Sequence, residues 1–175
     1  METTRLILRQ ARVNDVNDIY EMLSSDHVLK YNMMSFKTME QVKDLVIKNS
    51  TDESVYYLEL KDSNKVIGEI TLSKDELRYG VHAISISYYL HEKYVKKGYM
   101  FEALTQVLSR LFNQDHYQLV SARVFADNDA SLGLLKKLGF VQEGLLRKAV
   151  VGYRNILHDD VLFSLLAEDY KGKKK

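Results

Sequence analysis

The alternation of hydrophobic and polar positions predicts strands and helices that follow one another along the chain. Polar and apolar residues alternate over 5–9, which is typical of a half-buried strand. A helical stripe of apolar residues follows over 16–23, and Asn14 is its expected N-cap. The sequence Thr-Met-Glu-Gln matches a capping box, so a second helix is expected from Thr38 to about Asn49.

The middle of the chain predicts a hairpin and then a strand-loop-helix unit. Two β-rich runs, 55–61 and 65–73, are joined by the turn-forming sequence Asp-Ser-Asn, which predicts a hairpin. Another strand is expected at 83–90. An apolar stripe at helical spacing begins after Gly98, so a loop and a helix follow that strand.

The last third of the chain predicts a strand at 117–126, a short helix at 130–138 and further strands from Phe140 to Leu166. Strands and helices in this mixed order indicate an α/β or α+β fold. We therefore expect a three-layer α/β/α sandwich around a mixed central sheet of about six to seven strands.

Composition indicates one domain. The chain has 175 residues, of which 46% are hydrophobic, and it contains no proline-rich or glycine-rich linker. We expect a single domain at 1–170 and a flexible basic tail at 171–175. Docking of that tail to a ribosome or nucleic acid is the alternative interpretation.

Charge and cysteine usage exclude several function classes. The 25 basic residues nearly cancel the 24 acidic ones, so a dedicated nucleic-acid binder is not expected. Cysteine is absent, which excludes a disulfide framework, a thiolate nucleophile and a zinc site with sulfur ligands. Segment 1–9 is charged and lacks the apolar core of a signal peptide, and no later run is long enough to span a membrane. A cytoplasmic protein without a membrane partner is expected.

A basic loop stands between a predicted strand and the start of a predicted helix, at 94–100. The first amides of a helix lack intrahelical partners and carry partial positive charge, so such a place favours phosphates. Gly98 allows the backbone to approach a ligand closely. A second element follows a strand end at 128–140, with a polar cap, a short helix and a Gly-Phe exit.

These two elements, in this order and at this spacing, resemble those of the GNAT superfamily of N-acetyltransferases. The resemblance is strongest to the branch that acetylates the N-terminal amines of ribosomal proteins, and it extends from Thr4 to Leu166. It implies a GNAT-like α/β/α fold whose central sheet is splayed in the middle. It also implies transfer of an acetyl group from acetyl-CoA, without a metal, to a primary amine by direct attack in a ternary complex.

The resemblance also implies where the coenzyme binds. The pantetheine arm would lie between the strand that ends near Leu90 and the one that ends near Phe125, and the loop after Leu90 would hold the pyrophosphate. The residues that match the coenzyme site are Tyr89, Leu90, Val95, Lys96, Lys97, Gly98, Tyr99, Met100, Asn128, Ser131, Leu134 and Lys137.

The sequence departs from the commonest family pattern at several positions. Lys96 stands where a glycine is usual, Met100 where an alanine is usual and Phe101 where a threonine is usual. Leu135 occupies the position of a tyrosine that serves many members as the general acid, so Ser131 or water is expected to protonate the leaving thiolate.

The base that deprotonates the amine is less directly marked. Ser85 occupies the position where the family often has a carboxylate, so Glu69 on the neighbouring strand is the first candidate. Asp159, His158 and His82 are the alternatives.

The acceptor stays open between two kinds of amine. Four tyrosines, Tyr31, Tyr88, Tyr99 and Tyr153, would suit a groove for a peptide N-terminus. A polyamine or aminoglycoside would need acidic walls, for which Asp26, Glu69, Asp159 and Asp160 are available. A catalytically silent acyl-CoA-binding module or sensor is the alternative function, and a monomer or homodimer is expected.

Overall fold

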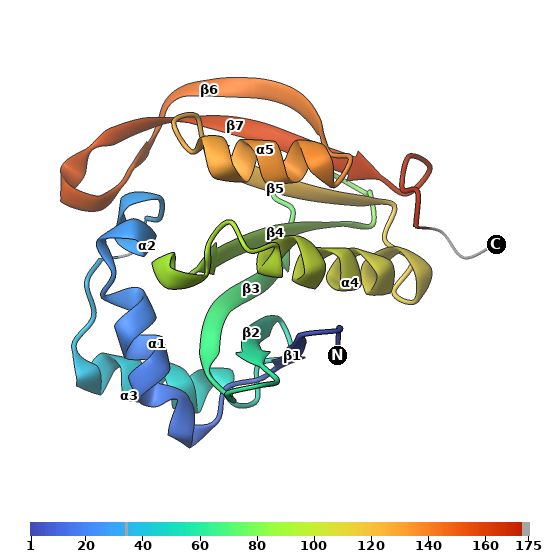
Figure 1. The fold of residues 1–175 in the computed structure, drawn as a ribbon. Coiled ribbons are helices and arrows are strands. Elements are labelled where there is room, and N and C mark those ends of the chain that lie inside the picture. The colour runs from blue at the N-terminus through green and yellow to red at the C-terminus, as the bar shows by residue number, and fades with distance from the viewer. Residues whose placement is uncertain (34, 173–175) are drawn as a thin grey trace.

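A computed structural model describes residues 1–33 and 35–172 of the chain. These residues form one seven-stranded mixed sheet in the order β1-β2-β3-β4-β5-β7-β6, shown in Figure 1. The predicted fold class is therefore confirmed. The strands are β1 (Leu6–Arg9), β2 (Val55–Leu60), β3 (Val66–Lys74), β4 (Ala83–Leu90), β5 (Leu119–Phe125), β6 (Val141–Val151) and β7 (Leu157–Leu166).

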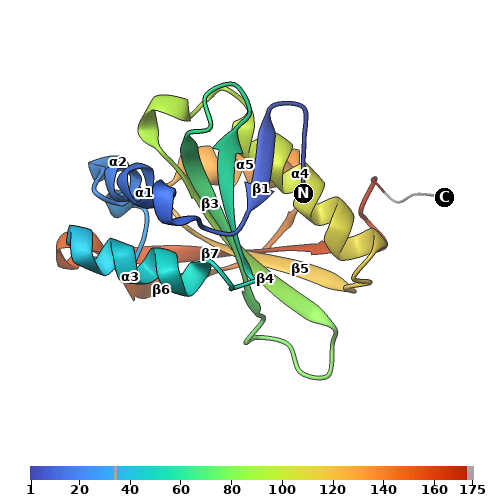
Figure 2. The same ribbon diagram turned by 90° about the horizontal axis from the view of Figure 1, so that it is seen from below.

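Five α-helices of the described residues lie in two layers on the sheet. They are α1 (Val16–Leu23), α2 (Asp26–Lys30), α3 (Met39–Asn49), α4 (Tyr99–Asn113) and α5 (Asp129–Lys137). Apolar residues of α4 and α5 share one core with the sheet, whereas those of α1, α2 and α3 share a second core with it. Figures 1 and 2 show α1, α2 and α3 gathered together, apart from α4 and α5.

Most local signals in the sequence are confirmed. Thr38 and Gln41 form the capping box at the start of α3, with the Thr38 hydroxyl accepting from the Gln41 amide at 3.3 Å. Asn64 turns the β2–β3 hairpin with a φ of 56°. Asn128 caps α5, because its side-chain oxygen accepts from the Ser131 amide at 3.2 Å.

Two features at the N-terminal side differ from the sequence prediction. Asn14 does not cap α1, because it lies inside a short 3-10 turn, Val13–Asp15, that leads directly into the helix. Helix α2 was not expected. It has five residues, too few to show an apolar period, and only its N-cap Ser25 marks its start. The predicted tail at 171–175 lies partly outside the described residues, at 173–175, so its separation from the domain stays a prediction.

The sheet is splayed between its two parallel strands. Pairing of β4 with β5 begins at Ala83 and ends with the pair Ile86 and Ala122. Beyond that point β4 stays paired with β3 as far as Leu90, and β5 stays paired with β7 as far as Phe125. Residues 87–90 and 123–125 therefore face each other across a gap in the hydrogen-bond ladder.

Gly68 lets β3 and the end of β4 approach closely beside this gap. It pairs with Leu90, and a Cβ atom added at Gly68 would lie 2.8 Å from Leu90 Cδ1 and 2.9 Å from the Tyr89 carbonyl oxygen. The second contact is with backbone, so β4 would have to shift to accept a side chain.

We therefore expect Gly68→Ala to lower the free energy of unfolding by roughly 1–3 kcal/mol, the usual cost of overpacking. Chemical denaturation measures this directly. Gly144→Ala on β6 is the matched control, because an added Cβ there meets no atom within 4 Å. Equal stabilities for the two variants would contradict the close approach at Gly68.

Candidate active site

A cavity of about 440 Å³ lies at the splay. Tyr88, Tyr89 and Leu90 of β4 line it, together with the loop that follows, the start of α4, and α5. His27, Val28, Tyr31 and Asn32, in and after α2, also line it. Since α2 belongs to one helical layer and α4 and α5 to the other, the cavity is lined by residues from both helical layers.

Most of the residues expected at the coenzyme site line this one cavity. Those that do are Tyr89, Leu90, Val95, Lys96, Gly98, Tyr99, Met100, Asn128, Ser131, Leu134 and Lys137. Lys97 does not, and its ammonium lies 5.4 Å from the centroid of the Tyr94 ring. Met100 and Phe101, the two bulky departures, form part of the wall, and Lys137 Nζ lies 4.3 Å from the Phe101 ring centroid.

The loop before α4 has a strongly curved backbone. Lys96 and Gly98 both have left-handed φ angles, 60° and 82° respectively. The first hydrogen bond of the helix runs from the Glu102 amide to the Gly98 carbonyl at 3.0 Å. The amides of 99–101 therefore have no partner within the helix and are available to an anion at the mouth of the cavity.

Arg5, ahead of β1, holds this loop in place, a role that the sequence did not reveal. Its Nη1 donates to the Lys97 carbonyl at 3.0 Å and its Nε to Glu102 at 2.7 Å. Its guanidinium lies 4.2 Å from the centroid of the Tyr99 ring. Burial tends to raise the pKa of Glu102, but hydrogen bonds from Thr3 and Arg5 outweigh it and lower that pKa. An ionised Glu102 maintains the ion pair with Arg5 that holds the loop.

Ser131 and Tyr88 approach the cavity from different elements. Ser131 is in the first turn of α5, and Tyr88 is on β4 just beyond the last β4–β5 pair. The Tyr88 hydroxyl oxygen is buried. Burial raises the pKa of Tyr88 to about 12, and hydrogen bonding with the Ser131 side chain opposes part of that shift.

Glu69 does not lie with Ser131, because it is not among the residues that line the cavity. Its carboxylate accepts hydrogen bonds from Tyr89 Oη at 2.5 Å and Thr71 Oγ1 at 2.9 Å. Burial raises the pKa of Glu69 above its ordinary value, against the effect of these hydrogen bonds. Glu69 thus secures Tyr89 within the sheet.

The other candidates for the base also lie outside the cavity. His82 stacks on Tyr117, His158 Nδ1 lies 3.3 Å from Asp127 Oδ1, and Asp159 accepts from the Lys148 amide. No Asp or Glu is among the described residues that line the cavity. His27 does line the cavity, although nothing in the sequence around it marked it as a site residue, because α2 was not expected. The His27 ring packs edge-on against the Tyr31 ring, with centroids 6.0 Å apart.

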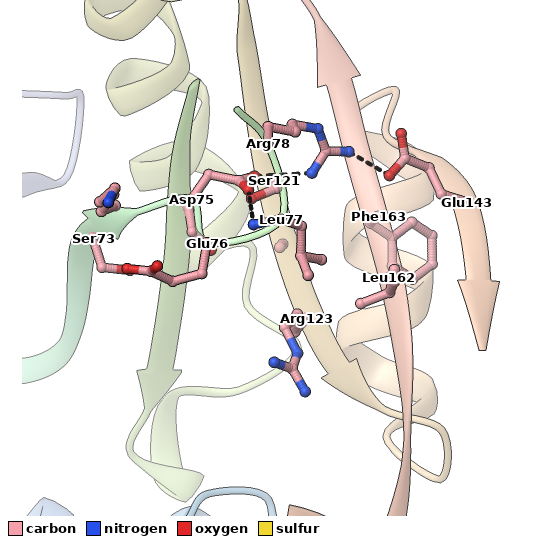
Figure 3. A pocket seen from close by; sticks show the side chains of 13 residues that line it. Ser73, Asp75, Glu76, Leu77, Arg78, Ser121, Arg123, Glu143, Leu162 and Phe163 are labelled. Carbon is pink, nitrogen blue, oxygen red and sulfur yellow. Dashed lines mark hydrogen bonds and ion pairs between the residues drawn. The ribbon is translucent and has the colours of Figure 1, made fainter. Parts of the chain in front are cut away.

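A second cavity of about 200 Å³ lies under the β3–β4 loop, at a different part of the sheet. Figure 3 shows Arg78 reaching across it to Glu143, and its other nitrogen donates to Asp75 at 2.9 Å. Ser85, at the position where the family often has a carboxylate, lines this cavity and not the larger one. In the smaller cavity Arg78 is already paired with Asp75 and Glu143, so the larger cavity is the candidate active site.

Two negative findings concern the described residues alone. In 1–33 and 35–172 no group of three or more His, Cys, Asp or Glu side chains is placed to hold a metal ion. None of the helices in those ranges has the length and apolar character needed to cross a membrane.

Comparison with known proteins identifies the family. The family model of the acetyltransferase (GNAT) domain matches residues 5–141. The uncharacterized N-acetyltransferase YnaD of Bacillus subtilis (strain 168) is 28% identical over 96% of this chain and 97% of its own. The [ribosomal protein uS5]-alanine N-acetyltransferase of Escherichia coli (strain K12) is 30% identical over 67% of this chain and 60% of its own.

A solved structure agrees over the whole fold. The crystal structure of an acetyltransferase (GNAT family) from Bacillus anthracis superimposes with a TM-score of 0.85 and 26% identity, and the match covers 96% of this chain and 98% of that one. The protein is an N-acetyltransferase that uses acetyl-CoA to acetylate an amine. Its chain belongs to the GNAT family of acetyltransferases.

Proposed function

We propose that acetyl transfer takes place in the larger cavity, with acetyl-CoA entering from the α4 and α5 side and the amine from the α2 side. The observation that carries this proposal is that residues of both helical layers line one cavity at the splay. Two substrates that enter from opposite faces can meet there without displacing each other. Holding them together in a ternary complex supplies much of the rate enhancement.

The coenzyme is bound mainly through backbone groups. Residues 87–90 of β4 present a free strand edge on which pantetheine amides can pair as an added strand does. The amides of 99–101 receive the pyrophosphate at the start of α4. Lys96 and Lys137 add positive charge at this end of the cavity.

Transfer proceeds by direct attack. The sequence has no cysteine to carry the acetyl group, so the amine nitrogen attacks the thioester carbonyl itself. A backbone N–H near Leu90 stabilises the oxyanion, and Ser131 or water assists the departing thiolate.

For the base, the geometry supports His27 over Glu69. A base must reach the amine proton directly or through one water. His27 lines the cavity on the amine side, whereas the Glu69 carboxylate is held by Tyr89 and Thr71 away from it. We assign proton removal to His27 and give Glu69 the task of fixing Tyr89.

Peptide N-termini are the acceptor class that the cavity fits best. A polyamine carries further ammonium groups that need carboxylates, and none is among the described lining residues. Tyr31 and Asn32 instead offer an aromatic ring and an amide. The Escherichia coli relative is named for an alanine of ribosomal protein uS5, which agrees with this choice. A cytoplasmic location, and the choice between monomer and homodimer, stay predictions.

The proposal is tested by thiol release from acetyl-CoA with a panel of amines. We expect turnover with peptides that have a free N-terminal amine and little with spermidine. The same peptides acetylated at the N-terminus are the matched controls and should be inert. Binding of acetyl-CoA without thiol release from any amine would instead support a silent binding module. A burst of acyl-enzyme would contradict direct attack.

The two cavity lysines are expected to strengthen coenzyme binding through charge. Lys96→Gln and Lys137→Gln should each raise the Kd for acetyl-CoA by roughly 5- to 10-fold and weaken its salt dependence. Isothermal titration calorimetry at two salt concentrations measures both effects. Lys43→Gln, on the exposed side of α3, is the control and should bind as the wild type does.

The two candidates for the base make opposite predictions for turnover. We expect His27→Gln to lower kcat roughly 100-fold, as is typical for loss of a general base, and Glu69→Gln to leave kcat close to the wild-type value. His116→Gln, at an exposed histidine outside the cavity, is the control. A large loss in Glu69→Gln with none in His27→Gln would return the role of base to Glu69.

A further inference from the structure

A negative charge stands at the helix end that is proposed to bind the pyrophosphate. Glu102 is in the first turn of α4, directly after the amides of 99–101, which have no partner within the helix. Its side chain is only 18% exposed. Burial raises the pKa of Glu102, but hydrogen bonds from Thr3 and Arg5 outweigh burial and lower that pKa, so the carboxylate is ionised at neutral pH. A carboxylate within one helical turn of these amides repels a diphosphate, because both are negative.

Arg5 supplies the compensating positive charge. Its Nε donates to Glu102 Oε2 at 2.7 Å, and its backbone amide donates to Glu102 Oε1 at 2.8 Å. The same guanidinium donates through Nη1 to the Lys97 carbonyl at 3.0 Å. Its Nη2 lies 3.4 Å from the point where a Cβ atom of Gly98 would stand. The positive charge therefore lies against both the carboxylate and the loop that precedes α4.

The pair acts on the cavity from outside it. Arg5 and Glu102 are not among the residues that line the larger cavity, and they lie 97 residues apart in the sequence. Charges that are partly exposed influence one another over about 8–10 Å before salt screens them. One turn of helix is shorter, about 5.4 Å, so the charge of this pair reaches an anion bound at the start of α4.

We propose that Arg5 is a positioning residue for the coenzyme, which cancels the charge of Glu102 and so keeps the start of α4 attractive to the pyrophosphate. The assignment rests on the proposed function of the larger cavity. Coenzyme affinity then depends on the balance of these two charges and not on either side chain alone. A purely mechanical clamp would instead need both side chains to hold the loop.

The two roles make opposite predictions for a double-mutant cycle. Arg5→Gln leaves Glu102 uncompensated and should raise the Kd for acetyl-CoA by roughly 5- to 10-fold, as expected for one partly screened charge. Glu102→Gln removes the repulsion and leaves Arg5 positive, so the Kd should fall by roughly 3-fold. The double variant restores the charge balance and should bind within about 2-fold of the wild type.

The experiment is isothermal titration calorimetry of the four proteins with acetyl-CoA at low and at high salt. The loss in Arg5→Gln should shrink at high salt, because salt screens the repulsion. Arg110→Gln is the matched control. Arg110 pairs with Asp115 at 3.1 Å near the other end of α4, so this variant should bind as the wild type does. Thermal unfolding without ligand checks that each variant is folded.

The possible failures are distinguishable. If Glu102→Gln leaves binding unchanged or weaker, or if the double variant binds no better than Arg5→Gln, the charge-balancing role of Arg5 is overturned and the coenzyme site stands. If the wild type does not bind acetyl-CoA, the proposed function of the cavity fails as well. Glu102→Gln decides the matter even if Arg5→Gln is unstable, because its expected effect is a gain in affinity.

Discussion

The candidate active site depends on one interruption in the sheet, where hydrogen bonding between β4 and β5 ends after Ile86 and Ala122. Both strands keep a partner on their other edge, β3 and β7 respectively, so the interruption does not unravel the sheet. It leaves backbone donors and acceptors on the two facing edges, and such groups require partners. An amide-bearing ligand can satisfy such groups by pairing as an added strand, which is how we propose that pantetheine binds in this gap.

The alternation of side chains along β4 gives the two faces of the sheet at this gap different chemistry. Neighbouring residues on a strand point to opposite faces. Tyr89 therefore extends into the layer of α1 and α3, where its hydroxyl donates to Glu69, while Tyr88 faces the layer of α4 and α5. The hydroxyl of Tyr89 is held by Glu69, whereas the side chain of Tyr88 lines the cavity. A register shift of one residue would exchange the two faces and remove both placements.

The sequence predicted those parts of the site that depend on local backbone chemistry. Gly98 and Asn128 mark helix starts because their own conformations and side chains favour those positions, and no distant residue is needed to recognise them. Contacts between distant segments left no such mark. Arg5 holds the carbonyl of Lys97, 92 residues further along the chain, and His27 reaches the cavity only through a helix too short to show a period.

The same distinction explains why the sequence alone gives no direct mark of a base. A strand pattern gives alternation but not which face is which, and Glu69 lies between Tyr57 and Tyr89 only once three strands are in register. In that register it is buried on the face opposite α4 and α5, where burial favours its neutral form. A carboxylate of that kind is well suited to hold a hydroxyl and poorly placed to meet an amine.

Lys96 shows how a departure from the family pattern can be accommodated. Its φ of 60° is a conformation that glycine adopts freely and that costs other residues about 1–2 kcal/mol. Arg5 offsets part of this cost by fixing the next carbonyl, that of Lys97. The lysine in turn adds a positive charge beside amides that already favour an anion. In the proposed function, coenzyme binding thus combines backbone geometry with side-chain charge, whereas catalysis depends on side chains that the splay brings together from separate elements.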